Sequence, residues 1–562
     1  MSETQNTPEQ KPKLPEHYEL ERTETDDTGV RLFTLTDHES QVQTTLAEFN
    51  DNVDVHTLMA WVGARTSRSA DSYPDIYRQV YQAQNASEKL AKVFVSYGHA
   101  SVADMSPAMI FMNRIPMHQA FWMFNHTSVG GGQELSTRYV ELDNLGVAPL
   151  EKFVDSEYMD QLQMESLSRQ WEAVQENSTQ MYHKWTPKLE GALREYLHAN
   201  TDPETKVPNS TVTARTLDVS RFWLPIGAQT SMTMLSSTRS WVDMISQLRS
   251  SGDVQHEELG DQLHTLLRLK DYDEAQDLQA ELSALTKYSE GKDTLANNLG
   301  ELAAFLESDQ RFDELAQVET RDEEPTKVKL LEITDFSSYG EQLALSYITT
   351  LHPQLDERAA LRYLSSLDDD SRAEMGRIML QDHMHHDLMR NPGDVRGPLF
   401  VLETAQAYLR DLNRHRAAGR LVPALEGHNL DAIVYAGFNQ NFQLHNAEYL
   451  EAFKDEWSAD IQAHYEQIYS LYDELKRTVP DSAGAIINLL PLGHQMKMHI
   501  SGPVTQMNYL ASLRISLGGD YGYRNAVYEM LDQLRDDPYL SPMLPNINRP
   551  NPNNVDEILG RS

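Results

Sequence analysis

The sequence predicts an α+β fold in which two tandem copies of one domain, each with helices packed on a small antiparallel sheet, are joined by a helical connector. Three observations predict this fold. Similar segments recur in the same order in the two halves of the chain. Strand-like alternation and helical periodicity both occur within each half. With 562 residues, the chain is also too long for one hydrophobic core.

The chain divides into five expected segments. Residues 1–28 are polar and acidic, which predicts a disordered N-terminal segment and argues against a signal peptide. Residues 29–260 and 327–535 are the two expected copies. Residues 261–326 are rich in Leu, Ala, Glu and Asp at helical spacing and should form the connector. Residues 536–562 are rich in Pro and Asn and should lie extended.

Four pairs of similar segments indicate the duplication. The first pair is VRLFTLTD from Val30 and VKLLEITD from Val328, both of which have the alternation of a strand. The next pairs are FNHT with NRHR, FWLPIGAQTSMTM with NLLPLGHQMKMHI, and two segments that end at Arg249 and Arg514. The offset between partners falls from 298 (328 − 30) to 265 (514 − 249), which small deletions in the second copy would explain.

The composition restricts the possible partners. The formal net charge is −37, which disfavours nonspecific binding to nucleic acid or to an anionic membrane. No apolar run approaches the roughly 18 to 20 residues that cross a bilayer. The chain has no cysteine, which excludes disulfides, thiolate metal sites and cysteine nucleophiles and is typical of a cytoplasmic protein. An anionic ligand would therefore need a local cluster of arginines.

A loop in the first half suits a small polar ligand. The apolar run from His118 ends at a triple glycine, Gly130–Gly132, and is followed by Glu134, Ser136 and Arg138. A carboxylate, a hydroxyl and a guanidinium at this spacing could grip a small polar molecule. The alternative is an ordinary surface turn.

Several further motifs accompany this loop, and together they resemble those of the flavin-dependent thymidylate synthases. The resemblance covers about Gly29 to Leu263 and is fainter from Lys327 to Arg535. It is carried, in family order, by Ala64-Arg65-Thr66-Ser67, Gly98-His99-Ala100-Ser101, Glu134-Leu135-Ser136-Thr137-Arg138-Tyr139, Arg221 with Leu224-Pro225, Leu248-Arg249 and Gln255-His256-Glu257.

The resemblance implies reductive methylation of dUMP to dTMP, with FAD as cofactor and methylenetetrahydrofolate and NADPH as co-substrates. Such chemistry uses no protein nucleophile, in agreement with the absence of cysteine. The residues implied to bind dUMP are Glu134, Ser136, Arg138, Arg221 and Arg249, of which Ser136 and Arg249 would be catalytic. The residues implied to bind FAD are Ser67, His99, Ser101, His126, Arg239, Arg414, His415 and Arg416. No metal site is expected, because the histidines of QDHMHHD (381–387) are better explained as a solvated helix face.

Each copy departs from the family pattern where the other keeps it. The first copy has Asn125-His126-Thr127 in place of Arg-His-Arg, whereas the second copy has Arg414-His415-Arg416 but AAGRLVPALEG in place of Glu-x-Ser-x-Arg-Tyr. One explanation is a composite site shared by the two copies, in a homodimer that imitates a tetramer of single domains. The alternatives are a catalytically degenerate flavin or nucleotide binder and a purely structural helical assembly.

Overall fold

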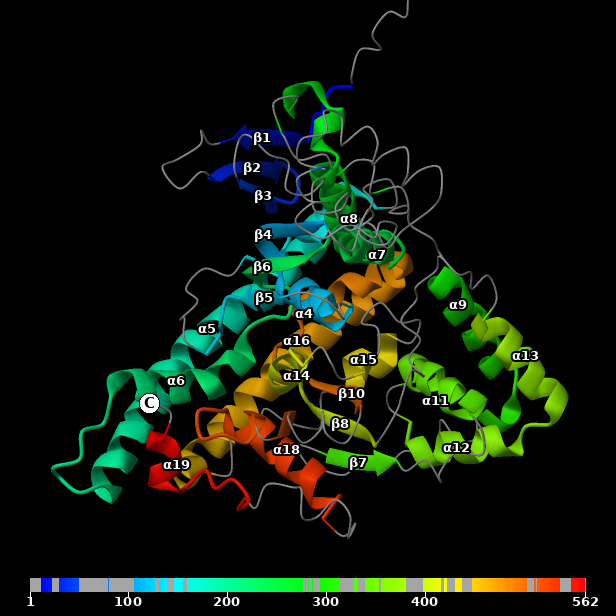
Figure 1. Ribbon diagram of the computed structural model, residues 1–562. Helices are drawn as coiled ribbons and strands as arrows, with labels where there is room; N and C mark the ends of the chain where they lie inside the picture. The colour runs from blue at the N-terminus through cyan, green and yellow to red at the C-terminus, as the bar shows by residue number, and fades with distance from the viewer. Residues whose placement is uncertain are drawn as a thin grey trace, which may run out of the picture.

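The computed structural model shows an α+β fold with two antiparallel sheets (Figure 1). The residues that it describes are 12–22, 30–49, 79, 106–126, 131–138, 146–154, 159–275, 278, 282, 286, 294–312, 327–331, 339–352, 355–380, 398–415, 419–421, 430–436, 447–502, 510–511, 513–535 and 547–560.

The first sheet has six strands in the order β1-β2-β3-β4-β6-β5. Buried and less buried residues alternate along β4 and β6, because one face packs on helices that follow these strands. The bounds are β1 (Tyr18–Arg22), β2 (Val30–Asp37), β3 (Gln43–Phe49), β4 (Pro107–Pro116), β5 (Gly131–Glu134), β6 (Gln229–Ser237), α4 (Met117–His126), α7 (Thr238–Leu248) and α8 (Val254–Leu267).

The second sheet has four strands in the order β7-β8-β10-β9. Every residue of β10 is buried, because α11 and α12 lie on one side of this sheet and the central core on the other. A buried ion pair between Lys497 and Glu357 (Nζ–Oε1 2.6 Å) connects β10 to α12. The bounds are β7 (Lys327–Leu331), β8 (Leu399–Ala405), β9 (Gly419–Leu421), β10 (Gln495–Ser501), α9 (Thr294–Glu307), α11 (Tyr339–Leu351), α12 (Glu357–Ser366) and α13 (Asp369–Leu380).

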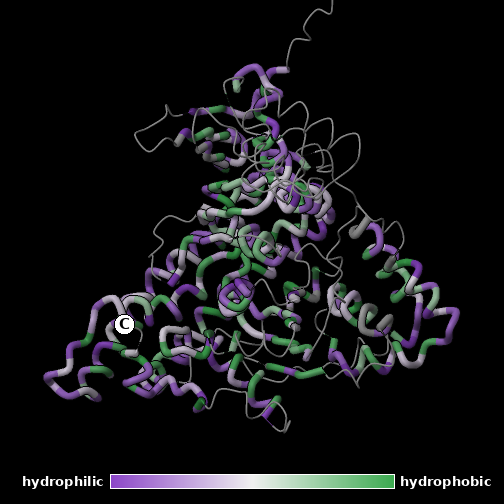
Figure 2. Tube along the Cα trace, viewed as in Figure 1, coloured by the Kyte–Doolittle hydropathy of each residue, from purple (hydrophilic) through white to green (hydrophobic). Residues whose placement is uncertain are grey.

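Two long helices join the halves at the centre of the molecule. Trp185 of α5 and Trp457 of α16 meet edge to face with ring centroids 4.9 Å apart, in one hydrophobic core built from both halves. Figure 2 shows hydrophilic positions in the turn that follows α5 and in the turn between α12 and α13, away from that core. The remaining bounds are α5 (Gln161–Asn200), α6 (Asn209–Ser220), α14 (Gln406–Leu412), α15 (Leu430–Ala436), α16 (Lys454–Thr478), α18 (Tyr521–Asp532) and α19 (Val555–Leu559).

The two Leu-Pro segments of the sequence meet as reciprocal partners. Pro225 and Pro491 form an isolated antiparallel bridge, and Gly227 is so close to Asn488 that a Cβ atom would lie 2.5 Å from its side-chain oxygen. Equivalent amides donate in both directions: Ile226 to the Leu490 carbonyl (2.6 Å) and Leu492 to the Leu224 carbonyl (2.7 Å), Gly227 to Asn488 (2.9 Å) and Gly493 to Phe222 (3.0 Å). The contact therefore has an approximate twofold symmetry.

Strand register corrects the first of the four sequence pairs. Beside β4, Leu46 of β3 pairs with Ile110, and beside β8, Leu330 of β7 pairs with Phe400. Strand β7 thus takes the place of β3, not of β2, and TTLAEFND from Thr44 matches VKLLEITD from Val328. The prediction was wrong because β2 and β3 have similar strand patterns, which sequence alone does not order. Strands β1 and β2 extend the first sheet beyond this match.

The two termini also differ from expectation. Residues 18–22 lie in the segment predicted to be disordered, yet they form β1, because Tyr18–Arg22 pair along the whole register with β2. The C-terminal segment predicted to be extended contains α19, because the Asn554 side chain accepts from the amides of Asp556 and Glu557 and caps a helix there. In the expected connector, α9 is helical as predicted, whereas α8 crosses the expected boundary at residue 260.

Buried histidines predict acid sensitivity. Burial lowers the pKa of His352, His464 and His499 to about 4 each. An unfolded histidine takes up a proton near pH 6.5, so stability is complete above that pH and is lost as the pH falls toward 4, by roughly 3 kcal/mol per histidine. We expect circular dichroism to show unfolding well above pH 4, with a lower midpoint in His464→Gln. Stability that stays constant from pH 7 to 4.5 would contradict this.

Candidate functional site

Charged side chains from both halves of the chain meet in one buried group, which we call the interdomain cluster. Its first-half members lie at the end of β5, in the loop after it, on α6 and just beyond α6. Its second-half members lie on α14, just beyond it, and at the start of α18. The cluster consists of Glu134, Arg138, Asp218, Arg221, Arg410, Asp411, Arg414, Asp520 and Tyr523.

Glu134 joins the loop of the first half to the Arg-His-Arg segment of the second half. Its Oε1 forms an ion pair with Arg410, whose side chain is buried. Its Oε2 lies 3.8 Å from Nη2 of Arg414, whose side chain is 31% exposed. Strand pairing holds the carboxylate there, because Glu134 is opposite Met232 at the end of β5. Two residues that are 280 positions apart (414 − 134) therefore contribute to one site.

Arg138 is buried and contacts both halves of the chain. Its Nε donates to Asp218 (2.7 Å) on α6 of the first half. Its Nη1 donates to the Tyr523 hydroxyl (3.2 Å) and its Nη2 to the Gly518 carbonyl (3.2 Å), both in the second half. Three nitrogens of this guanidinium are thus bound by the protein itself.

Arg221 lies between two carboxylates of the second half. Its Nη2 is 3.3 Å from Oδ2 of Asp411 and 3.0 Å from Oδ2 of Asp520, and all three side chains are buried. The Nε of Arg221 is buried without a hydrogen-bond partner in the described part of the chain. This guanidinium therefore has two anionic partners and one unused donor.

The start of α18 is shaped to place Asp520. The Oδ1 of Asp520 accepts from the Gly522 amide (2.8 Å) and caps α18, which leaves Oδ2 for Arg221. At Gly522, a Cβ atom would lie 1.9 Å from the Tyr408 ring, so α18 can approach α14 this closely only with glycine there. The helix cap and the ion pair therefore depend on the same carboxylate.

The charges of the cluster balance. Burial opposes the charge on Arg138, yet Asp218 and Asp411 raise its pKa above the usual value. Burial likewise opposes the ionised form of Asp411, yet Arg221 and Arg138 lower its pKa. The cluster contains four guanidinium groups (138, 221, 410 and 414) and four carboxylates (134, 218, 411 and 520), so its formal charge is zero.

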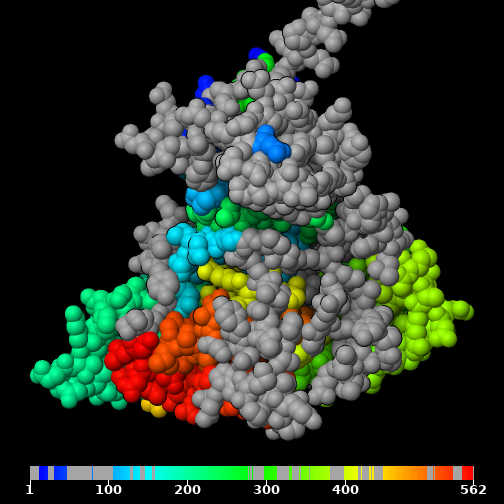
Figure 3. All heavy atoms as spheres, in the orientation of Figure 1, coloured from blue at the N-terminus to red at the C-terminus, as the bar shows by residue number. Residues whose placement is uncertain are grey.

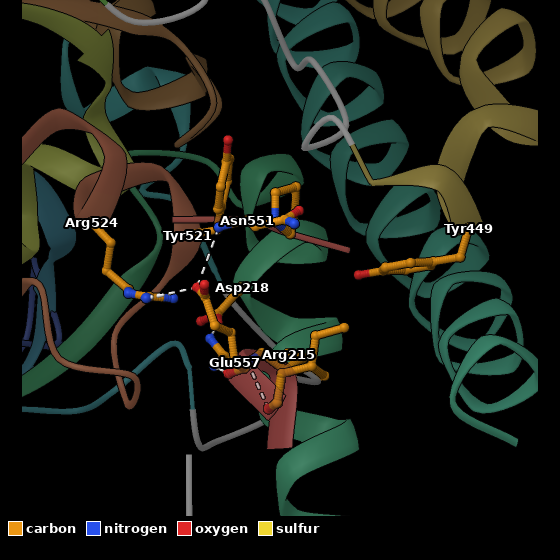
Figure 4. Close-up of a pocket in the computed structure, with 9 residues that line it drawn as sticks. Arg215, Asp218, Tyr449, Tyr521, Arg524, Asn551 and Glu557 are labelled. Carbon is orange, nitrogen blue, oxygen red and sulfur yellow. Dashed lines mark hydrogen bonds and ion pairs between the residues drawn. The ribbon is translucent and has the colours of Figure 1, made fainter. Parts of the chain in front are cut away.

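A pocket adjoins the cluster at Asp218. This carboxylate binds Arg138 through Oδ1, and its Oδ2 lies 3.7 Å from Nη1 of Arg215. Figure 4 shows the pocket with residues from α6, α18 and the C-terminal segment around it, and Figure 3 shows that segment, in red, against the first half of the chain in green. It is lined by Arg215, Asp218, Tyr449, Tyr521, Arg524, Asn551, Pro552, Glu557 and Ile558.

The structure brings together part of the predicted site. Glu134, Ser136, Arg138, Arg221 and Arg414 lie in or beside the cluster, and the Ser136 hydroxyl accepts from the Arg138 amide (3.3 Å). His415 is next to it: its Nε2 accepts from Arg514 (2.6 Å), and burial together with Arg514 lowers its pKa to about 3.

Other predicted residues lie on different elements or outside the described residues. Arg249 ends α7 and pairs with Asp261 of α8 (Nε–Oδ1 2.7 Å). Arg239 is in the first turn of α7, and His126 ends α4, where its ring stacks on Trp122 with centroids 3.7 Å apart. The predicted residues outside the described ranges are Ser67, His99, Ser101, Arg416 and the histidines of 381–387.

Sequence reasoning missed five of the nine residues of the cluster, which are Asp218, Arg410, Asp411, Asp520 and Tyr523. Arg410 and Asp411 lie in the mostly apolar run LFVLETAQAYLRDL, and charges in such a run were an available signal for a buried polar site. Asp218, Asp520 and Tyr523 belong to no motif. Arg514, the sequence partner of Arg249, also approaches the cluster, with its guanidinium 5.9 Å from the Tyr523 ring centroid.

Two other kinds of site were sought in the described part of the chain. No described helix combines the length and apolar character that crossing a membrane requires. The described residues also contain no group of three or more histidine or acidic side chains arranged to hold a metal ion.

Comparison with known proteins places the first half of the chain in a family. Residues 51–266 match the family model described as thymidylate synthase complementing protein, whereas no curated protein matches the chain. The matched region includes the loop with Glu134 and Arg138 and ends within α8. The resemblance noted in the motifs is thus confirmed for residues 51–266, which match the model of the flavin-dependent thymidylate synthase family.

Proposed function

We propose that this protein methylates dUMP reductively to dTMP at one composite site per chain, using FAD, methylenetetrahydrofolate and NADPH. The observation that carries the proposal is Glu134 of the first half bound by Arg410 and Arg414 of the second half. In the sequence, the loop with Glu134 and the Arg-His-Arg segment are each incomplete in one half. Their contact supports a site in which the loop of the first half and the Arg-His-Arg segment of the second half act together.

We also propose that the two halves arose by duplication. The reciprocal hydrogen bonds around Pro225 and Pro491 support this, as does the shared register of β5 and β9 beside β6 and β10. The helices that follow β4 and β8 also begin in the same way. At the start of α4 the Met117 amide donates to the Ala228 carbonyl (2.9 Å), and at the start of α14 the Gln406 amide donates to the His494 carbonyl (3.0 Å). A bulge at Arg114, with φ of 62°, accounts for one extra residue in β4.

The same equivalence explains why we propose one site per chain. With offsets of 288 in the loop and 289 in the helix, Glu134 corresponds to Val422, Arg138 to Glu426, and Arg414 to Asn125. Arg410 and Asp411 correspond to Phe121 and Trp122. At the second possible site, four of these five charges are thus replaced by uncharged residues, and that of Arg138 is replaced by the opposite charge of Glu426.

Among the described residues, the Arg414 side chain has the properties expected of a flavin ligand. The Nε of Arg414 is buried without a hydrogen-bond partner among the described residues, and the Arg414 side chain is the most exposed of the four arginines in the cluster. A donor of this kind suits an anionic or carbonyl group of a cofactor. When bound, FAD would supply the hydride, Arg414 and His415 would orient the flavin, and Ser136 would contact dUMP.

A second candidate is a flavin or nucleotide binder without synthase activity. The cluster favours it in one respect, because Arg138 and Arg221 are buried and already paired with carboxylates. We further propose that the protein is cytoplasmic, that its partners are dUMP and folate, with no nucleic acid or membrane, and that two chains form a homodimer.

The test is a titration with FAD followed by an assay. We expect the purified protein to bind FAD, seen as the absorption of oxidised flavin after gel filtration, and to form dTMP from dUMP when methylenetetrahydrofolate and NADPH are added. Glu134→Gln should reduce dTMP formation strongly, because it removes the charge that holds two arginines. FAD binding without dTMP would leave the second candidate, and absence of both would reject each of them.

A further inference from the structure

Three buried carboxylates contact the two arginines that the resemblance assigns to dUMP. Asp218 pairs with Arg138, and Asp411 and Asp520 pair with Arg221, while Asp218 also lies 3.7 Å from Arg215. The Asp520 side chain is fully buried, and those of Arg221 and Asp411 are 3% and 8% exposed. Because water screens these charges little, their balance decides which ligand charge is tolerated.

A phosphate group would meet both an attraction and a repulsion at this place. The unused Nε of Arg221 is a buried donor that a phosphate oxygen could accept from. The carboxylates of Asp411 and Asp520, at 3.3 and 3.0 Å from Nη2, already provide the negative charge that this guanidinium requires. A phosphate would have to displace them or lie beside them.

We propose that Asp411 and Asp520 are internal counter-ions of Arg221 that compete with the ligand phosphate and set how strongly the site prefers a nucleotide to a nucleoside. The proposal rests on the proposed function only for the location of the site. It predicts that the native protein gains little affinity from the phosphate of dUMP. Neutralising either carboxylate should convert Arg221 into a phosphate-binding group.

The experiment compares D411N and D520N with the native chain. Asparagine keeps the shape of aspartate, and at position 520 it can still cap α18 through its side-chain oxygen. Binding of dUMP, deoxyuridine and inorganic phosphate is measured by isothermal titration calorimetry at low salt. We expect each variant to bind dUMP about tenfold tighter or more and deoxyuridine with unchanged affinity.

A matched control removes one negative charge at a position far from the cluster. Glu374→Gln removes a carboxylate from an exposed ion pair with Arg377 on α13, which Figure 1 places in a separate group of helices away from α18. We expect E374Q to leave all three affinities unchanged. A gain in E374Q equal to that of D520N would show that net charge alone is responsible, and would overturn the proposal.

Two results separate this inference from the proposed function. A gain in phosphate affinity in D411N and D520N, together with no dTMP formation by the native protein, would support the counter-ions and reject the synthase activity. Unchanged or weaker dUMP binding in both folded variants would reject the counter-ions, whatever the activity. If neither variant folds, the same titrations are made with D520S, which keeps a side-chain oxygen that can cap α18, and with the native protein. A native preference for dUMP over deoxyuridine of about a hundredfold or more would overturn the proposal.

Discussion

Arg138→Ala is expected to destabilise the protein by about 3 to 5 kcal/mol. The change leaves the buried carboxylate of Asp218 without its closest partner and removes the hydrogen bonds to Tyr523 and Gly518 that connect the two halves. The melting temperature should fall by roughly 3 to 4 °C, measured by circular dichroism or calorimetry. From sequence alone, Arg138 is a ligand-binding residue; its burial adds a structural role.

The control for this prediction is Arg194→Ala. Arg194 also pairs with a carboxylate, Glu190, but on the exposed side of α5 (Nη2–Oε1 2.6 Å, side chain 43% exposed). Exposed pairs at this spacing contribute at most about 0.5 kcal/mol, so the melting temperature should hardly change. Equal effects in the two variants would mean that the contacts of Arg138 are not formed in solution.

Arg414→Ala is expected to act in the opposite way, with a large effect on ligand binding and a small one on stability. Arg414 has one ion pair, at 3.8 Å, and a 31% exposed side chain. Loss of a charge-assisted hydrogen bond to a ligand costs roughly 1.5 to 3 kcal/mol, or a ten- to hundredfold weaker affinity. We expect this loss for FAD, measured by quenching of flavin fluorescence on titration.

Arg477→Ala serves as the matched control for Arg414→Ala. Arg477 is an exposed arginine at the end of α16 that donates to the Asp473 carbonyl (3.2 Å), so its loss should change neither stability nor flavin affinity. If Arg414→Ala binds FAD as the native protein does, Arg414 is not a flavin ligand, and the composite site loses its main support.

The sequence allowed prediction of the parts of the site that are local in the chain. Glu134, Ser136 and Arg138 lie within five residues, and their spacing alone indicates a polar ligand. Their partners could not be predicted, because pairing with Arg410 or Tyr523 depends on how β5, α14 and α18 pack. The same reason explains the strand error: which strand is next to β4 depends on register, and similar strand patterns do not reveal it.

The order in which the chain is synthesised gives the C-terminal segment a particular importance. Arg215 of α6 donates to carbonyls near the end of the sequence, those of Leu517 (2.8 Å), Glu557 (2.8 Å) and Ile558 (3.3 Å). A ribosome releases these carbonyls long after α6 has emerged, and domains generally fold as units during synthesis. Until residue 558 has been made, Arg215 therefore lacks at least one of these three acceptors. Premature termination near residue 510 would remove all three carbonyls, so the packing of α6 in the first half depends on a segment that is synthesised some 300 residues later (517 − 215 = 302).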